Sequence, residues 1–268
     1  MVILGYICAI LIGISLGLLG SGGSILTVPI MVYLMRISPV DATGLSLFVV
    51  GITSATGAVT YLRKKLVDLK TAAIFATPSI LSVFLTRKYL MPLIPDPVFQ
   101  SPSFILSKEL FILILFSVLM VVVGYNMIRK AGYKEPESEE FHHYNYPGLI
   151  GIGFVSGLLT GILGVGGGFI IIPALVLFAK IPVRMSVGTS LLIIAVNSLG
   201  GFAQEAMSGH SDIDYKFLAL FGALSVAGIF IGLMISLKLQ PALLKKIFGW
   251  FIVLMGISIF LKEIILKM

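Results

Sequence analysis

Two glycine-rich segments hold the residues whose types and spacing are best suited to binding a ligand. Each lies between apolar stretches, and the candidate binding positions in them are Gly20, Ser21, Gly22, Gly23, Ser24, Gly164, Gly166, Gly167 and Gly168. Glycine reaches positive φ and lets a backbone approach a ligand closely. A helix that begins just after such a break directs free N–H groups and the positive end of its dipole into the gap. The two segments therefore predict an anion site built largely from backbone donors.

The apolar stretch after each glycine segment carries polar side chains at helical spacing. The sets are Ser46, Thr53, Ser54, Thr56 and Thr60 after the first segment, and Thr189, Ser190, Asn197, Ser198 and Gln204 after the second. Donors inside a helical bundle can replace the water around an anion. The candidate substrate-binding side chains are Ser46, Thr53, Ser190 and Asn197. The alternatives are hydrogen bonds between helices, worth about 0.6 kcal/mol each, and small-xxx-small packing of the glycines. Both interpretations stay open here.

Other reactive residues form no pattern typical of catalysis or metal binding. Cys8 is the only cysteine and lies in an apolar stretch, which excludes a disulfide or a CxxC site within this chain. His142 and His143 lie in a polar stretch without matching ligands, and neither glycine segment is followed by the Gly-Lys-Ser/Thr of a P-loop. Asp41 and Glu205 lie near the ends of apolar stretches, so no buried proton relay is evident. We therefore expect no metal, no cofactor and no enzymatic activity.

The composition indicates that these segments fold in a lipid bilayer rather than in water. The chain is 58% hydrophobic and 12% charged, with a mean hydropathy of +1.09, whereas soluble domains are about 25% charged. Its apolar residues run in blocks of roughly 17 to 25, the length of a membrane-spanning helix. The net charge of +7 comes from short basic clusters between blocks, which we interpret as topology signals rather than a nucleic-acid surface. An all-α, polytopic transmembrane bundle follows.

The expected organisation is two transmembrane halves joined by a polar linker. The apolar stretches expected to be helical are 1–20, 42–62, 70–86, 108–129, 148–163, 184–203, 216–237 and 243–262. Each repeat also contains a Gly-broken helix or a re-entrant hairpin, which gives about 8 to 10 segments in all. The three regions are a first transmembrane repeat at 1–130, a linker at 131–147 and a second repeat at 148–268. Four prolines between Pro92 and Pro102 predict a loop. No basic n-region precedes the first block, so we do not expect a cleaved signal peptide.

The second half repeats the first. Residues 13–57 align with 157–201 without a gap, at a constant offset of 144, and both glycine breaks stay in register. Gly20 aligns with Gly164, and Pro29 with Pro173. Internal duplication is the economical explanation.

The charges of the loops predict that the two halves are inverted. Arg63, Lys64 and Lys65 mark a cytoplasmic loop, whereas the equivalent loop at 205–214 is acidic and has no lysine or arginine. Arg87 and its neighbour fall on the outside in this scheme and fit it less well, so a parallel duplication stays an alternative. Inverted repeats recur in secondary transporters, where the halves exchange roles during alternating access.

These residues resemble the TauE/SafE family of prokaryotic membrane permeases over essentially the whole chain. The matching motifs are 17–23 with Pro29, 161–168 with Pro173, the helix starts 42–46 and 186–190, and the closing stretch 239–249. The resemblance implies a multi-pass protein of a prokaryotic cell membrane that exports sulfite, sulfoacetate or related sulfonates. A gradient of ions or substrate would drive it. Ser21 and Ser24 make the first motif less glycine-rich than the second, which leaves the substrate's identity open.

The function expected from the sequence is therefore that of a secondary transporter or permease for a small anion, with a sulfur oxyanion or organosulfonate as substrate. Its expected partners are this anion and the lipid bilayer, and no nucleic acid. An anion channel would use the same lining residues without alternating access. A transporter of an unrelated small solute and a homodimeric assembly are further alternatives.

Overall fold

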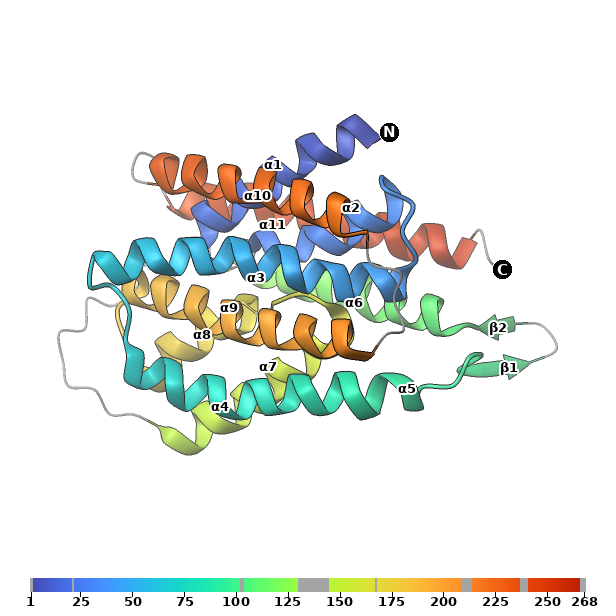
Figure 1. The fold of residues 1–268 in the computed structure, drawn as a ribbon, viewed down its shortest axis with the longest axis horizontal. Helices are drawn as coiled ribbons and strands as arrows, with labels where there is room; N and C mark the ends of the chain where they lie inside the picture. The colour runs from blue at the N-terminus through green and yellow to red at the C-terminus, as the bar shows by residue number, and fades with distance from the viewer. Residues whose placement is uncertain are drawn as a thin grey trace.

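The computed structural model describes residues 2–20, 22–101, 104–129, 145–166, 168–208, 214–236 and 241–265 of the 268-residue chain. Most of the linker predicted at 131–147 lies outside these residues. The elements, whose α-helices and β-strands are labelled in Figure 1, are α1 (Val2–Leu19), η1 (Gly22–Leu26), α2 (Thr27–Tyr33), α3 (Pro39–Arg63), α4 (Leu69–Leu85), η2 (Thr86–Leu90), α5 (Met91–Leu93), β1 (Phe99–Ser101), β2 (Phe104–Leu106), α6 (Lys108–Arg129), α7 (Tyr146–Leu163), α8 (Gly168–Ala174), η3 (Leu175–Ala179), α9 (Val183–Ser208), α10 (Tyr215–Ser236) and α11 (Pro241–Ile265).

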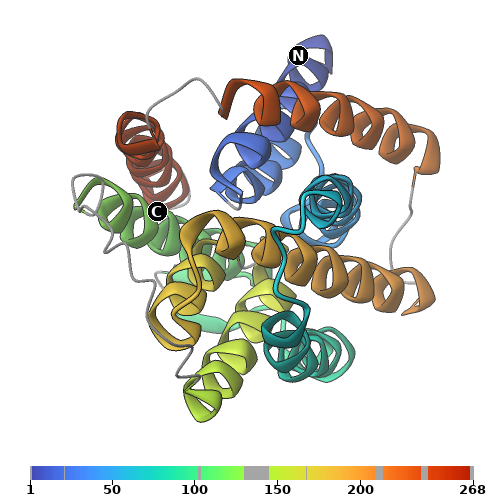
Figure 2. The ribbon, with the colours of Figure 1, turned by 90° about the vertical axis from the view of Figure 1, so that its left-hand side faces the viewer.

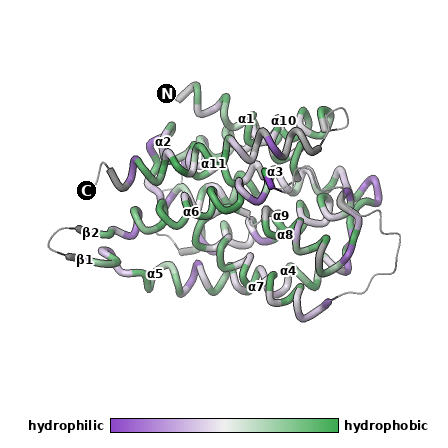
Figure 3. Tube along the Cα trace, turned by 180° about the vertical axis from the view of Figure 1, so that it is seen from behind, coloured by the Kyte–Doolittle hydropathy of each residue, from purple (hydrophilic) through white to green (hydrophobic). Residues whose placement is uncertain are grey.

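The helices are built to lie in lipid. Within the described residues, six helices are long and apolar enough to cross a membrane: Pro39–Arg63, Leu69–Leu93, Lys108–Arg129, Tyr146–Leu163, Arg184–Met207 and Tyr215–Ile235. Hydrophobic residues run along the helix bodies, while hydrophilic ones gather mostly near their ends (Figure 3). Many large apolar side chains are exposed on the outside, as lipid contact requires. The structure thus confirms an all-α, polytopic fold.

One stretch differs from the sequence prediction. The helix expected to end near residue 86 continues through the π-helical turn η2 into α5, so Pro92 lies in a helix rather than in a loop. Pro92 stands in the first turn of α5, where proline's fixed φ suits a helix. The remaining prolines of this region border a short antiparallel hairpin, in which Phe99 of β1 pairs with Leu106 of β2. Strands of only three residues are too short to show a periodic pattern in the sequence.

A glycine ends the long helix at each of the two predicted breaks. Gly20 has φ +72° directly after α1, and Gly164 has φ +69° directly after α7. Glycine adopts these left-handed conformations at the end of a helix with the least strain, because it has no Cβ. The short elements η1 and α2 follow the first break, and α8 and η3 follow the second. Both breaks therefore separate a long helix from a short helical segment.

The long helices pack in two lateral pairs on either side of a central pair. Figure 2 shows α1 with α10 on one side, α4 with α7 on the opposite side, and α3 with α9 between them. The central helices are antiparallel, because Gly44 of α3 contacts Glu205 while Gly57 contacts Leu191 of the same partner. Helices α6 and α11 pack together beside this core, also antiparallel, through Gly124 and Gly249.

The two lateral pairs are each parallel and approach closely at glycines. A Cβ on Gly13 would collide with the carbonyl of Ser225, and one on Gly17 would lie 2.8 Å from the amide nitrogen of Leu233. Likewise, a Cβ on Gly157 of α7 would collide with the carbonyl of Ser79 in α4. Small residues allow membrane helices such contact, which dispersion and packing then stabilise.

Candidate functional site

Each glycine break is buried against the start of the long central helix that follows the other break. Gly20 packs on the side chain of Val187 in α9, where an added Cβ would come within 3.2 Å of the Val187 Cβ. Gly164 packs on α3, where an added Cβ would lie 2.7 Å from the Cα of Thr43. The Ser46 hydroxyl donates to the carbonyl of Gly164 at 2.8 Å. Non-helical backbone is thus enclosed by protein, as hydrocarbon surroundings demand.

The second break reaches the crossing of α3 and α9. A Cβ on Gly166 would lie 2.6 Å from Cγ2 of Ile194, 2.9 Å from Cγ1 of Val50 and 3.4 Å from Oγ of Ser198. The hydroxyls of Ser198 and Ser54 are buried and have no hydrogen-bond partner among the described residues. These two serines align at the repeat offset of 144. Both serines are among the polar residues that the sequence indicates for these helices, but the predicted ligands are their neighbours Thr53 and Asn197.

The four candidate side chains are all fully buried, and most serve their own helices. The single hydroxyl proton of Ser46 is shared between Gly164 O and Thr43 O, the latter at 2.9 Å, while Thr53 donates to Val49 O at 2.6 Å and Ser190 to Val187 O at 2.8 Å. A hydroxyl has one proton, so each must rotate before it can donate to an anion. Asn197 differs, because its Nδ2 donates across helices to Ser79 Oγ at 2.6 Å.

Gly23 of the first break packs against α1. A Cβ on Gly23 would lie 2.7 Å from Ile12 O, and Ser24 is fully buried. Gly22 begins η1, and Gly168 begins α8 in the second break. Ser21 and Gly167 lie outside the described residues.

Sequence reasoning missed a buried ion pair between Arg87 in η2 and Glu205 in α9. Arg87 Nη1 lies 3.0 Å from Glu205 Oε2, and the two side chains are 1% and 14% exposed. From the sequence, Arg87 stands out only because it fits the predicted topology poorly, and Glu205 only as an acidic residue near the end of an apolar stretch. The usable signal was a charge within an apolar span, since such charges are costly and mark functional positions.

Arg87 and Glu205 belong to a larger polar interface formed by α4, η2 and α9, against which α7 packs. We define this polar interface by its six residues, Ser79, Ser82, Thr86, Arg87, Asn197 and Glu205. Among described residues, the atoms in it that are buried without a hydrogen-bond partner are Ser82 Oγ, Asn197 Oδ1, and Nε and Nη2 of Arg87. Buried polar groups are normally paired, so such a concentration indicates a place for water or a ligand.

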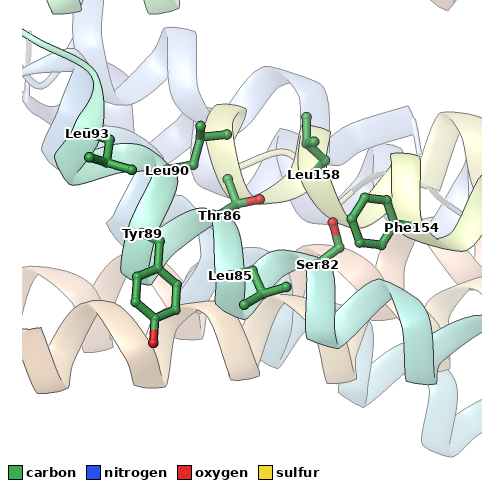
Figure 4. A pocket seen from close by; sticks show the side chains of 8 residues that line it. All are labelled: Ser82, Leu85, Thr86, Tyr89, Leu90, Leu93, Phe154 and Leu158. Atoms are coloured by element: carbon green, nitrogen blue, oxygen red, sulfur yellow. The ribbon is translucent and has the colours of Figure 1, made fainter.

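A groove of about 230 Å³ opens beside this interface, between α7 and the continuous helix of α4, η2 and α5 (Figure 4). Ser82, Thr86 and Tyr89 supply its hydroxyl groups, and the rest of the lining is apolar, including Leu90 and Phe154. Such a lining offers a hydrated anion few donors. The groove is therefore distinct in chemistry from the polar interface behind it.

Comparison with known proteins gives a consistent picture. The family model described as "Sulfite exporter TauE/SafE" matches residues 5–259. A "Probable membrane transporter protein" of Xylella fastidiosa (strain Temecula1) is 28% identical over 256 residues, covering 93% of this chain and 91% of its own. The "Probable membrane transporter protein YunE" of Bacillus subtilis is 27% identical over 275 residues, covering 94% and 96%. A similarly named protein of Methanocaldococcus jannaschii is 25% identical over 268 residues, covering 94% of each chain. No solved structure matches the chain.

The fold, with its apolar spans and buried glycine breaks, defines a multi-pass helical membrane protein of the transporter class. The chain belongs to the TauE/SafE sulfite exporter family. The resemblance noted in the sequence is thereby confirmed, and the protein is a membrane transporter rather than an enzyme.

Proposed function

We propose that this transporter moves a small anion, most specifically a sulfur oxyanion or an organosulfonate, by alternating access of two inverted repeats. The observation that carries the proposal is the pair of breaks at Gly20 and Gly164. Both have positive φ, and each is packed against the central helix that follows the other. Broken helices that meet near the middle of a repeat structure are typical of substrate sites in secondary transporters.

The helix packing supports the inverted arrangement. Helices α3 and α9, which occupy equivalent places in the two proposed repeats, run antiparallel. The contacts of Gly57 with Ile229 and Leu191 are mirrored by those of Gly201 with Val83 and Leu47. A two-fold axis perpendicular to the helices would produce both features. The six spans of the described residues, the two broken segments and α11 would together give the 8 to 10 segments of this architecture.

A topology test follows from the inverted arrangement. A reporter fused after Lys64 should lie in the cytoplasm, and one after Ser211 should lie outside. Both reporters on one side of the membrane would favour the parallel duplication instead. The test needs no knowledge of the substrate, so it stands apart from the question of what is carried.

The proposed substrate class rests on chemistry and on the family. The family model names sulfite, whereas the relatives' names specify no substrate. The breaks offer backbone donors, and the adjoining helices α3 and α9 offer the hydroxyls of Ser54 and Ser198, which have no partner among the described residues. However, η1 has five residues and α8 seven, so their dipoles are short and side-chain donors must supply part of the binding.

Anion binding can be tested on the purified full-length protein by thermal unfolding in detergent. Sulfite, thiosulfate, sulfoacetate, taurine, sulfate and chloride would be compared at equal ionic strength. A ligand that binds only the folded protein raises its stability by RT ln(1 + [L]/Kd), which is about 2.7 kcal/mol at 100 times Kd. A selective rise with one sulfur oxyanion is expected. No rise with any anion would count against the proposed substrate class.

A further inference from the structure

We infer that Arg87 is the charged residue that binds the transported anion, and that the carboxylate of Glu205 occupies its guanidinium when no anion is bound. This inference rests on the proposed anion transport and adds the residue that selects for negative charge. It places the anion in the polar interface, one helix contact away from the second glycine break.

The hydrogen bonding of Arg87 is the first reason. A guanidinium keeps its charge in proteins and presents five N–H donors in a planar fork. Glu205 accepts from Nη1 at 3.0 Å, while Nε and Nη2 have no partner among the described residues. The side chain is 1% exposed, so bulk water does not satisfy these donors. Leaving them unpaired is expensive in a buried site unless a ligand or water completes the set.

The position of Arg87 next to the second break is the second reason. Glu205 lies against Gly44, where an added Cβ would be 2.9 Å from its Cγ. The adjacent residue Thr43 contacts Gly164 of the break. From the other side, Thr86 contacts Gly161 of α7, three residues before the break. Arg87 is thus enclosed by the elements that form the break rather than placed at a remote surface.

The surrounding donors are the third reason. The hydroxyl of Ser82 is buried and unpartnered within the described residues, and those of Ser79 and Thr86 are buried on the same continuous helix as Arg87. Ser82 and Ser79 lie where α7 approaches α4 most closely, at Gly157. An arginine fork with hydroxyl donors around it suits an anion with two or more oxygens on one centre, such as sulfite or a sulfonate. A halide offers the fork no such geometry.

The role of Glu205 follows from its exposure and its charge. Glu205 is the more exposed partner, at 14% against 1%, so its carboxylate can leave the pair for water more readily than Arg87 can. Without an anion the pair is neutral, which lowers the penalty of burying the guanidinium. An arriving anion replaces one negative partner with another. Because Glu205 is on α9 and Arg87 on η2, this exchange changes the contact between two helices when substrate binds.

The test measures the affinity of the full-length detergent-purified protein for sulfite and for sulfoacetate by titration calorimetry. Arg87→Lys keeps the charge but loses the fork, and we expect its affinity to fall at least about tenfold. Glu205→Gln removes the competing carboxylate, and its affinity should rise several-fold. Lys88→Gln is the matched control, because Lys88 is the next residue, is exposed and carries the same charge. Its affinity should equal that of the unaltered protein.

Two results would overturn the inference. Either Arg87→Lys binds both anions as tightly as the unaltered protein, or Glu205→Gln, which keeps the arginine, binds them no more tightly. In either case the proposed function is retained if the unaltered protein binds an anion. If the unaltered protein binds neither anion, the proposed function and this inference both fall. Size-exclusion profiles verify that each variant is folded, and Glu205→Gln decides the matter should Arg87→Lys not fold.

Discussion

The two lateral helix pairs have the same backbone arrangement but opposite chemistry. A Cβ on Gly157 would collide with Ser79 O in the α4–α7 pair, as one on Gly13 would with Ser225 O in the α1–α10 pair. Matching the pairs by these contacts sets Ser82, Thr86 and Arg87 against Gly228, Gly232 and Leu233. One interface holds Arg87 and Ser82, which have donors without a partner among the described residues, while the other is glycine and aliphatic apart from Ser225.

The difference indicates that the two lateral helix pairs have different roles. Direct backbone contact at Gly228 and Gly232 makes the α1–α10 interface tight and dry, which suits a fixed scaffold. The interface of α4, η2 and α9 holds polar groups that need water or a ligand, which suits a site whose occupancy changes. If the two halves arose by duplication, as proposed, both pairs inherited the same backbone arrangement. Later substitution then left the charge of Arg87 in the α4–α7 pair alone, because Leu233 stands at the matching position of the α1–α10 pair.

Overpacking the dry interface should have the largest effect. A Cβ on Gly228 would collide with the carbonyl of Ile10 and lie 3.0 Å from its carbon, so Gly228→Leu must separate α10 from α1. We expect a loss of stability of about 3 kcal/mol or more, seen as a lower thermal midpoint or as aggregation. Gly151→Leu is the control, since a Cβ at Gly151 meets nothing within 4 Å. Equal stability of both variants would show that the interface is not tight.

Substitution at the second break should abolish transport more than it affects folding. Gly166→Leu places a side chain against Ile194 and Val50 at the helix crossing and removes close backbone approach. Anion flux into proteoliposomes should fall to background while membrane insertion persists. Gly151→Leu again serves as the control and should transport normally. Normal flux through Gly166→Leu would reduce the break to a packing feature.

Water accessibility should separate the two interfaces directly. In a Cys8→Ser background, Ser79→Cys in the polar interface should react with a hydrophilic thiol reagent, and sulfoacetate should slow the reaction. Ser225→Cys, at the matching position of the dry interface, should react at least about tenfold more slowly because a thiol must reach water to ionise. Equal rates at the two positions would mean that hydration does not distinguish the interfaces.

Single hydroxyls should give the smallest effect and the finest comparison. Ser82→Ala removes a donor of the polar interface that has no partner in the described part of the chain, so anion affinity should fall about three- to tenfold. Ser225 donates to Phe221 O in its own helix at 3.0 Å, and Ser225→Ala should leave affinity unchanged. Calorimetric titration with sulfoacetate measures both. A larger loss in Ser225→Ala than in Ser82→Ala would reverse the assignment of the two interfaces.

The sequence predicted the features that composition and glycine control. Apolar block length gave the long helices, and glycine gave the breaks at Gly20 and Gly164, because both signals are local. It did not predict the helix through Pro92 or the hairpin after it. The pair of Arg87 with Glu205 was also missed, since it joins residues 118 positions apart and depends on how α4 packs against α9. Long-range pairing is decided by tertiary packing, which one sequence does not display.

Sulfite counterflow in proteoliposomes tests the central claim most directly. Vesicles loaded with unlabelled sulfite would be diluted into labelled sulfite, and uptake followed with time and concentration. An anion transporter with alternating access should show saturable uptake that internal sulfite accelerates, and Arg87→Lys should reduce it more than Lys88→Gln. Linear uptake without acceleration would indicate a channel, and no uptake beyond empty vesicles would contradict sulfite transport.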